Sequence, residues 1–339
     1  MSEAPPLLLH VGYHKTATSW MQQRLFRPEH GYAQLMDHAE VDRLLTRPHG
    51  LEWDPEPARA LIARRRAALE PRFGPGLVPV ISSELLSGHP FHGGRESDVY
   101  AERLRQVAPG ARILVSIRAQ GRILPSVYMQ YLLRGGTLPP AEFFAGRTDW
   151  GFFAFSPVHF EYDRLVARYQ ALFGRDAVHL LQQEALKADM DAAAAALARF
   201  AGARRFEGLS EAARAVYAPS YPEHAVWALR RVNHVQRSVL NPRPVVSLGT
   251  TPYGLYRLVG GVLRRPPFAG WLGHRRPVSA HVAQAFAGRF AESNRRLAGI
   301  YPGSLDLRGY DVARPEAAAP EAAREAQARP DPGSEGQAA

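Results

Sequence analysis

Residues 7–20 read LLLHVGYHKTATSW, and this stretch decides the fold. The apolar run Leu7–Val11 predicts a buried strand, Gly12 permits a tight turn after it, and Ser19–Phe26 has a helical pattern. The first turn of a helix has unpaired N–H groups, so a strand–turn–helix junction of this kind suits an anion. Lys15 adds a positive charge. Three hydroxyls of the same loop add hydrogen-bond donors: Thr16, Thr18 and Ser19.

This loop is not a Walker A loop, although it has a lysine followed by a threonine. The Walker A pattern is G-x-x-x-x-G-K-[ST], whereas Lys15 lies three residues after Gly12 with no glycine before it. For the loop taken alone, an ordinary turn with a good helix cap is a competing interpretation.

Three further apolar runs alternate with helical patterns along the chain. The runs are Leu77–Ile81, Ala111–Ile117 and Ala177–Leu181. The helical patterns cover Pro57–Glu70, Gly121–Leu133, Glu161–Phe173 and Ala192–Phe200. Short apolar strands separated by helices predict an α/β fold: a central parallel sheet, like that of P-loop NTPases, flanked by helices on both faces.

Composition narrows the class of protein. The chain has 339 residues, enough for one large or two small domains, and it contains no cysteine, which excludes disulfides and thiolate chemistry. The formal net charge of +10 favours anionic partners without choosing among them. We find no apolar stretch long enough to span a membrane and no secretory signal, so we expect a cytoplasmic protein.

A second candidate anion site follows the run Ala111–Ile117. This strand ends at Arg118, and Ser126 lies eight residues later on the next predicted helix. A guanidinium donates two parallel charge-assisted hydrogen bonds to a phosphate, and a serine hydroxyl adds a third. An isolated arginine at the end of a strand is more often a surface charge, so the argument depends on the pairing with Ser126.

The run Leu77–Ile81 leads to a candidate general base. Ser82 and Ser83 follow it, and Glu84 then lies where ligands bind in open α/β sheets. An acidic helix cap is the simpler alternative for Glu84, and His89 and His92 are alternative bases.

The loop GYHKTATSW resembles the 5′-phosphosulfate loop of sulfotransferases that use 3′-phosphoadenosine 5′-phosphosulfate (PAPS), where P-K-[ST]-[GA]-T-[ST]-W is typical. His14 stands in place of the usual proline. The arginine–serine pair resembles the 3′-phosphate site of the same family. Two later segments, 180–202 and 290–297, also resemble it, so the resemblance runs from about Leu7 to Tyr310.

The resemblance implies a role for each matching residue. Lys15 would contact the bridging oxygen of PAPS, and Glu84 would be the base that many carbohydrate-type and bacterial members have. Trp20 would lie against the adenine, although a core position explains that residue type equally well. The implied donor-binding residues are Lys15, Thr16, Ala17, Thr18, Ser19, Trp20, Arg118 and Ser126. The R-K-G motif that completes the 3′-phosphate site in cytosolic members is missing; Arg230, Arg231 and Arg237 are the candidate substitutes.

The implied reaction is direct transfer of a sulfuryl group from PAPS, without a metal, to a hydroxyl or amine of a carbohydrate, lipid or small molecule. The acceptor and the oligomeric state stay open. A P-loop kinase and a non-catalytic nucleotide-binding or basic binding protein are the alternatives. We expect no nucleic-acid partner, because arginine dominates the basic excess, alanine is also abundant, and a GC-rich coding bias explains both without invoking function.

Two segments depart from the α/β pattern. We assign residues 1–312 to one sulfotransferase domain and expect residues 313–339 to be a disordered tail, since they have almost no large apolar residue.

Residues 241–277 form either a lid or wall of the acceptor site or a membrane-surface insert. An apolar helical face there packs on the core or lies on a membrane: Leu255, Leu258, Val259, Val262 and Leu263, with Arg257, Arg264 and Arg265 nearby. Five aromatic residues line the acceptor site or belong to the core: Phe143, Phe144, Trp150, Phe152 and Phe153.

Overall fold

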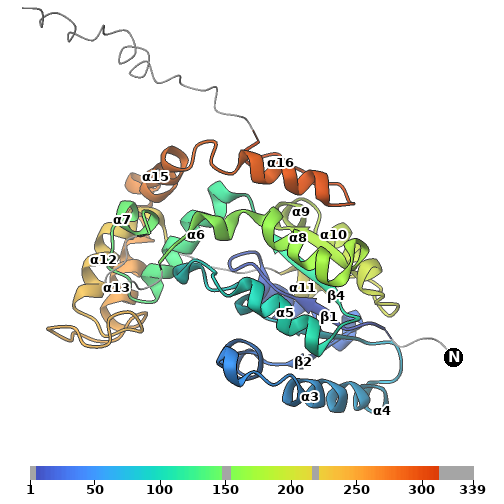
Figure 1. Ribbon diagram of the computed structural model, residues 1–339. Coiled ribbons are helices and arrows are strands. Elements are labelled where there is room, and N and C mark those ends of the chain that lie inside the picture. The colour runs from blue at the N-terminus through green and yellow to red at the C-terminus, as the bar shows by residue number, and fades with distance from the viewer. Residues whose placement is uncertain (1–4, 147–153, 216–220, 313–339) are drawn as a thin grey trace, which may run out of the picture.

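The computed structural model describes residues 5–146, 154–215 and 221–312. Within these ranges, five strands form one sheet in the order β2-β3-β1-β4-β5, and every neighbouring pair is parallel (Figure 1). The strands are β1 (Leu8–His10), β2 (Tyr32–Met36), β3 (Val78–Ser82), β4 (Arg112–Ile117) and β5 (Val178–Gln182). Because β1 lies between β3 and β4, the loops after these three strands meet at one edge of the sheet.

The strands bury side chains on both faces of the sheet. Successive side chains of a strand point to opposite faces, so Leu7 and Leu9 enter one core whereas Leu8 enters another. The helices that cover the first face are α3 (Glu56–Ala67), α5 (Ser97–Val107) and α8 (Tyr162–Phe173). The second face is covered by α1 (Thr18–Trp20) with the π-helical turn η1 (Met21–Leu25), by α10 (Met190–Ala201) and by α11 (Glu211–Arg214). The expected α/β architecture is confirmed.

The predicted elements agree with the structure, but several other elements were not predicted. All four apolar runs are strands, and the helical patterns correspond to α1 with η1, α3 with α4 (Leu69–Phe73), α6 (Gln120–Leu133), α8 and α10. The sequence reading missed β2 at the edge of the sheet, α5 between β3 and β4, the helices α12 (Val226–His234) and α15 (Pro277–Ala285), and several shorter helices.

A group of helices lies beside the sheet, around the far end of α6 (Figure 1). The helices α12 (Val226–His234) and α15 (Pro277–Ala285) pack on α6, α13 (Gly254–Leu263) packs on α12, and α14 (Phe268–Leu272) follows α13. The remaining short elements of the described residues are α2 (His38–Val41), α7 (Pro140–Phe144), α9 (Gln183–Ala188), η2 (Pro28–His30), η3 (Asp42–Thr46), η4 (Gly50–Glu52), η5 (Glu84–Ser87), η6 (Pro90–His92), η7 (Pro157–Phe160), η8 (Arg175–Ala177) and η9 (Glu223–Ala225). The helix α16 (Ala291–Ile300) returns to pack on α8.

The apolar face predicted in residues 241–277 divides between the core and the surface. On α13, Leu263 is buried, and Leu255 and Val259 pack partly buried against the core. Leu258 and Val262, one turn apart, are 63% and 47% exposed. Core packing therefore accounts for only part of this face.

Some sequence predictions fall outside the described residues. Trp150, Phe152 and Phe153 lie there, as does the tail at 313–339. The assignment of residues 1–312 to one domain stays a prediction. Among the described residues, no helix is long and apolar enough to cross a membrane.

Candidate active site

The loop after β1 has an unusual backbone. Lys15 and Ala17 have φ angles of 65° and 67°, and they are the non-glycine residues with positive φ in the described part of the chain. Such left-handed conformations cost on the order of 1–3 kcal/mol each and gather at functional sites. The strain is confined to the segment that the sequence singles out as an anion-binding loop.

Side-chain hydrogen bonds brace this loop from within. The hydroxyls of Thr16 and Thr18 both donate to the carbonyl oxygen of Tyr13. Thr16 also shares a hydrogen bond of 2.6 Å with the hydroxyl of Ser116, which His10 contacts from the other side. Both threonine hydroxyls are thus already engaged in hydrogen bonds within the protein, whereas the side chain of Ser19 is exposed to solvent. Contact of Thr16, Ala17, Thr18 or Ser19 with a phosphate stays a prediction.

Glu84 approaches the loop from the end of β3. Gly12 has a φ of 98°, and a Cβ atom built there would lie 3.0 Å from the Cα atom of Glu84. Glycine is therefore required for the close approach of these two segments. The carboxylate of Glu84 is half-buried and accepts a weak hydrogen bond of 3.4 Å from the side-chain amide of Gln22.

Arg118 is held at the end of β4 by its backbone. Its carbonyl oxygen accepts from the hydroxyl of Tyr162 at 2.6 Å, and the next amide, that of Ala119, donates to Glu184. The side chain then reaches Ser126: Nη1 of Arg118 lies 2.9 Å from the serine hydroxyl and 3.5 Å from the carbonyl oxygen of Lys15. Its Nε atom is buried without a hydrogen-bond partner. The predicted pairing of Arg118 with Ser126 is present.

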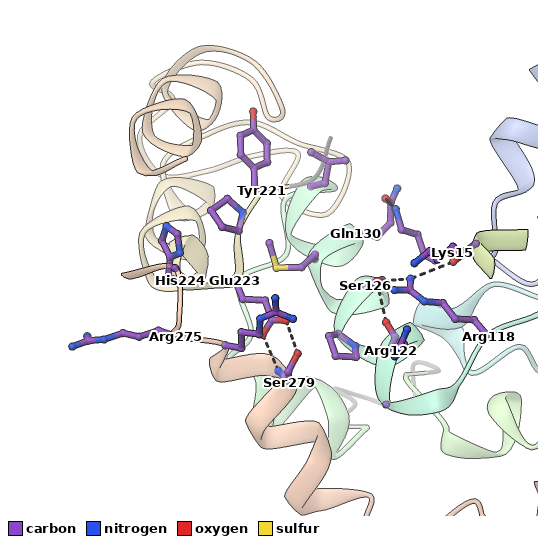
Figure 2. A pocket seen from close by; sticks show the side chains of 18 residues that line it. Lys15, Arg118, Arg122, Ser126, Gln130, Tyr221, Glu223, His224, Arg275 and Ser279 are labelled. Atoms are coloured by element: carbon purple, nitrogen blue, oxygen red, sulfur yellow. Dashed lines mark hydrogen bonds between the residues drawn. The ribbon is translucent and has the colours of Figure 1, made fainter. Parts of the chain in front are cut away.

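Lys15, Arg118 and Ser126 line one cavity of 760 Å³, here named the large cavity (Figure 2). This volume is within the range of about 300–1,000 Å³ that is usual for ligand sites. Its opposite wall comes from residues 221–224 and 273–279. Six cations line the large cavity: Lys15, Arg118, Arg122, Lys187, Arg275 and Arg276. The single carboxylate in its wall, Glu223, accepts from the amide and hydroxyl of Ser279.

The crowding of cations changes their titration. Burial lowers the pKa of Lys15, and the neighbouring Arg118 lowers it further, while Glu84 partly offsets both. Burial likewise lowers the pKa of Arg118. It also lowers the pKa of Lys187, which the positive charge of Arg118 lowers further. A bound anion would relieve this repulsion, so the large cavity has the electrostatics of an anion site.

A second cavity, of 90 Å³, also has Lys15 in its lining and is here named the small cavity. Lys15 and Gln130 line both cavities, and Nζ of Lys15 lies 3.4 Å from the amide oxygen of Gln130. Glu84, His14 and His89 also line the small cavity. Glu84 therefore lines a cavity that shares Lys15 with the large cavity.

The alternative bases differ in their surroundings. His89 lines the small cavity, but burial lowers its pKa to about 4, and its Nδ1 atom already accepts from the amide of Phe91. His92 is exposed and is not part of that lining. Sequence reading treated His14 only as a substitute for proline, yet its buried Nδ1 atom has no partner, and burial lowers its pKa well below the usual range. The neutral His14 is thus a further polar group at the small cavity.

The three arginines suggested to complete the 3′-phosphate site are not in the wall of the large cavity. Arg230 donates to the carbonyl oxygen of Thr137, Arg231 donates to that of Trp227, and Arg237 is exposed at the surface. Arg275 and Arg276, between α14 and α15, line the large cavity instead. Sequence reading missed them because no motif surrounds them and only the packing of α15 on α6 brings them there.

Three of the aromatic residues predicted near the site lie in the described part of the chain, and all three are buried in the core. Trp20 is 8% exposed and its indole nitrogen donates to the carbonyl oxygen of Ala213, so it packs in the core beneath the loop. Its contact with adenine stays a prediction. Phe143 and Phe144 are buried in the core as well. In the described part of the chain, no three histidine, aspartate or glutamate side chains are grouped to hold a metal ion.

Comparison with known proteins adds little to this geometry. No protein-family model matches the chain, and no curated protein does. Among solved structures, a sulfotransferase from Alicyclobacillus acidocaldarius is similar, with 18% identity over 68% of this chain and 94% of that chain and a TM-score of 0.40. At that score the likeness carries no argument about activity.

Proposed function

We propose that this protein transfers a sulfuryl group from PAPS to a hydroxyl or amine of a carbohydrate, lipid or small-molecule acceptor. One observation carries the proposal: Lys15 and Arg118, on the loops after β1 and β4, line the same cavity. A donor with phosphates at both ends of one nucleoside needs two such cationic groups within its own length. The resemblance of the two motifs to the PAPS-binding motifs supports the same function.

The side chains of the large cavity fit such a donor. Among the described residues, six cationic side chains and one carboxylate, that of Glu223, line the cavity. The carboxylate already accepts a hydrogen bond from the hydroxyl of Ser279. The buried Nε atom of Arg118 lacks a partner, which is costly in a folded protein and which a phosphate oxygen would satisfy. We assign Lys15 to the 5′-phosphosulfate, Arg118 and Ser126 to the 3′-phosphate, and Arg275 or Arg276 to completing that second site.

Lys15 lines both cavities, and this position supports the proposed reaction. PAPS supplies a sulfuryl group on a phosphate leaving group, and the reacting hydroxyl or amine of the acceptor would enter the small cavity. Glu84 takes the acceptor's proton as its oxygen or nitrogen attacks in line. Lys15 stabilises the negative charge that develops on the leaving group, so it binds the transition state more tightly than the ground state. His14 and Gln130 also line the small cavity and would hydrogen-bond the acceptor there.

Transfer of a radioactive sulfuryl group from labelled PAPS tests the proposal. The purified protein is incubated with pools of sugars, lipids, phenols and amines, and a parallel assay follows hydrolysis of labelled ATP with magnesium. We expect a sulfated product from one pool and none with Lys15→Ala. Magnesium-dependent ATP turnover without sulfation would overturn the proposal in favour of a kinase.

A further inference from the structure

The positive charge of the protein is concentrated in one segment. Residues 224–291 contain ten arginines and no aspartate or glutamate. This count equals the formal net charge of the whole chain, +10, so the remaining residues balance to zero. The segment includes α12, α13, α14 and α15, the helices that lie beside the sheet (Figure 1).

The exposed apolar side chains are concentrated in the same segment. Of fifteen large hydrophobic residues exposed in the described part of the chain, eleven lie between positions 227 and 271. They are Trp227, Val239, Leu240, Val245, Val246, Leu248, Tyr253, Leu258, Val262, Phe268 and Trp271. Isolated exposed hydrophobic residues are normal, but a cluster of this size marks an interaction surface. We name these eleven residues the apolar cluster.

Helix α13 shows how charge and apolar surface combine. Its inner face is fixed, because Tyr256 and Leu263 are buried in the core. Its outer face presents Leu258 and Val262, and Arg257 is exposed next to Leu258. In the next helix, Trp271 is 70% exposed. Arginines beside exposed tryptophan and leucine are typical of elements that lie in a membrane interface.

We propose that residues 224–276 dock on the surface of an anionic lipid bilayer. The arginines would pair with lipid phosphates, and the apolar cluster would enter the boundary between headgroups and acyl chains. A second copy of this chain is a poor partner for the same surface, because the nine arginines of residues 224–276 would face nine others. Nucleic acid would use the arginines but would leave the aliphatic side chains in water.

A cavity of 530 Å³ is lined mostly by residues of this segment and could bind an acyl chain. Its lining is mainly apolar and includes Val226, Trp227, Leu272 and Pro277. It shares Arg275 and Arg276 with the large cavity. Docking would therefore bring the bilayer surface next to the proposed donor site, although the docking itself does not depend on the proposed function.

Vesicle flotation of the full chain tests the docking. We expect the protein to float with vesicles of phosphatidylcholine mixed with phosphatidylglycerol, to remain behind with phosphatidylcholine alone, and to be released by high salt. The triple variant Leu258→Glu, Val262→Glu, Trp271→Glu should lose most of this binding. Leu51→Glu with Val99→Glu and Val158→Glu is the matched control, because it adds the same charge at three exposed positions outside the segment. Arg257→Gln with Arg265→Gln should weaken binding, whereas Arg43→Gln with Arg199→Gln, which removes the same charge at exposed positions elsewhere, should not.

A second measurement is made on the wild-type protein and does not depend on the triple variant. Lipids with brominated acyl chains quench tryptophans that enter the apolar layer, and Trp227 and Trp271 are the exposed tryptophans of the described residues. We expect strong quenching in anionic vesicles and its loss in Trp227→Phe with Trp271→Phe. Unquenched fluorescence in the wild type, or equal flotation of the triple variant and the control, would overturn the proposal. Tight binding to DNA, or a dimer disrupted by the triple variant, without vesicle binding would also overturn it. None of these readouts uses PAPS, so the result is independent of the sulfuryl-transfer assay.

Discussion

The Nη1 atom of Arg118 lies 3.5 Å from the backbone carbonyl oxygen of Lys15, although 103 positions separate the two residues. The parallel pairing of β1 with β4 produces this approach, since both loops leave the same edge of the sheet. The contact fixes the cationic side chain of one loop relative to the backbone of the other. The side chains of both residues also line the large cavity, so one ligand there could contact both.

Replacing Arg118 should change which nucleotides bind. We predict that Arg118→Ala weakens binding of 3′-phosphoadenosine 5′-phosphate by about 10- to 100-fold, the usual effect of losing charge-assisted hydrogen bonds. Binding of adenosine 5′-phosphate, which has no 3′-phosphate, should change little. Calorimetric titration of both nucleotides measures the difference. Equal weakening of the two would show that Arg118 does not contact the 3′-phosphate.

Replacing Glu84 should separate turnover from binding. Glu84→Gln keeps the shape of the side chain and removes its ability to take a proton, so we predict a loss of about 10²–10⁴-fold in kcat. The dissociation constant of 3′-phosphoadenosine 5′-phosphate should stay near the wild-type value, because Glu84 lines the small cavity and not the large one. Loss of nucleotide binding in this variant would assign Glu84 to the donor site instead.

Two pairs of arginines distinguish the wall of the large cavity from the nearby surface. Arg275→Gln with Arg276→Gln should weaken binding of 3′-phosphoadenosine 5′-phosphate, because both residues line that cavity. Arg231→Gln with Arg237→Gln is the matched control and removes the same charge from exposed positions. If both pairs weaken binding equally, the effect is one of net charge and not of contact.

Donor binding should take up protons. The pKa of Lys15 in the free protein is lowered from its ordinary value of 10.5, and an anion beside the ammonium would raise it again. Affinity should therefore fall as the pH rises through the lowered pKa, above about pH 7.5 where the phosphates themselves are ionised. Titration in buffers of different ionisation enthalpy counts the protons. The extra pH dependence should disappear in Lys15→Met, and proton release by the wild type would contradict this account.

The fold was largely predictable from local pattern. Four strands, including β1 and β4, are mostly apolar because both faces of the sheet are covered. The strand that was missed, β2, lies at the edge of the sheet, carries exposed Gln34 in its middle and has no β-branched residue. Such a strand depends on its neighbour β3 and leaves little signal of its own.

The site was predictable only where local motifs exist. Lys15 and Ser126 belong to motifs in which the spacing of basic and hydroxyl residues predicts an anion site, and both residues line one cavity of the structure. No motif in the sequence marks Arg276 or His14 as a candidate site residue. Arg276 reaches the large cavity because helices far apart in the sequence pack on one another. The Nδ1 atom of His14 lacks a hydrogen-bond partner because it is buried, and burial of a single atom cannot be predicted from the sequence.

Calorimetric titration with 3′-phosphoadenosine 5′-phosphate, applied to the wild type, Lys15→Ala and Arg118→Ala, tests the central claim most directly. We predict one nucleotide per chain in the wild type, with each variant weakening that same event by about tenfold or more. Two independent sites per chain, each lost in only one variant, would contradict the claim that both cations hold one donor. An affinity unchanged by either variant would contradict it equally.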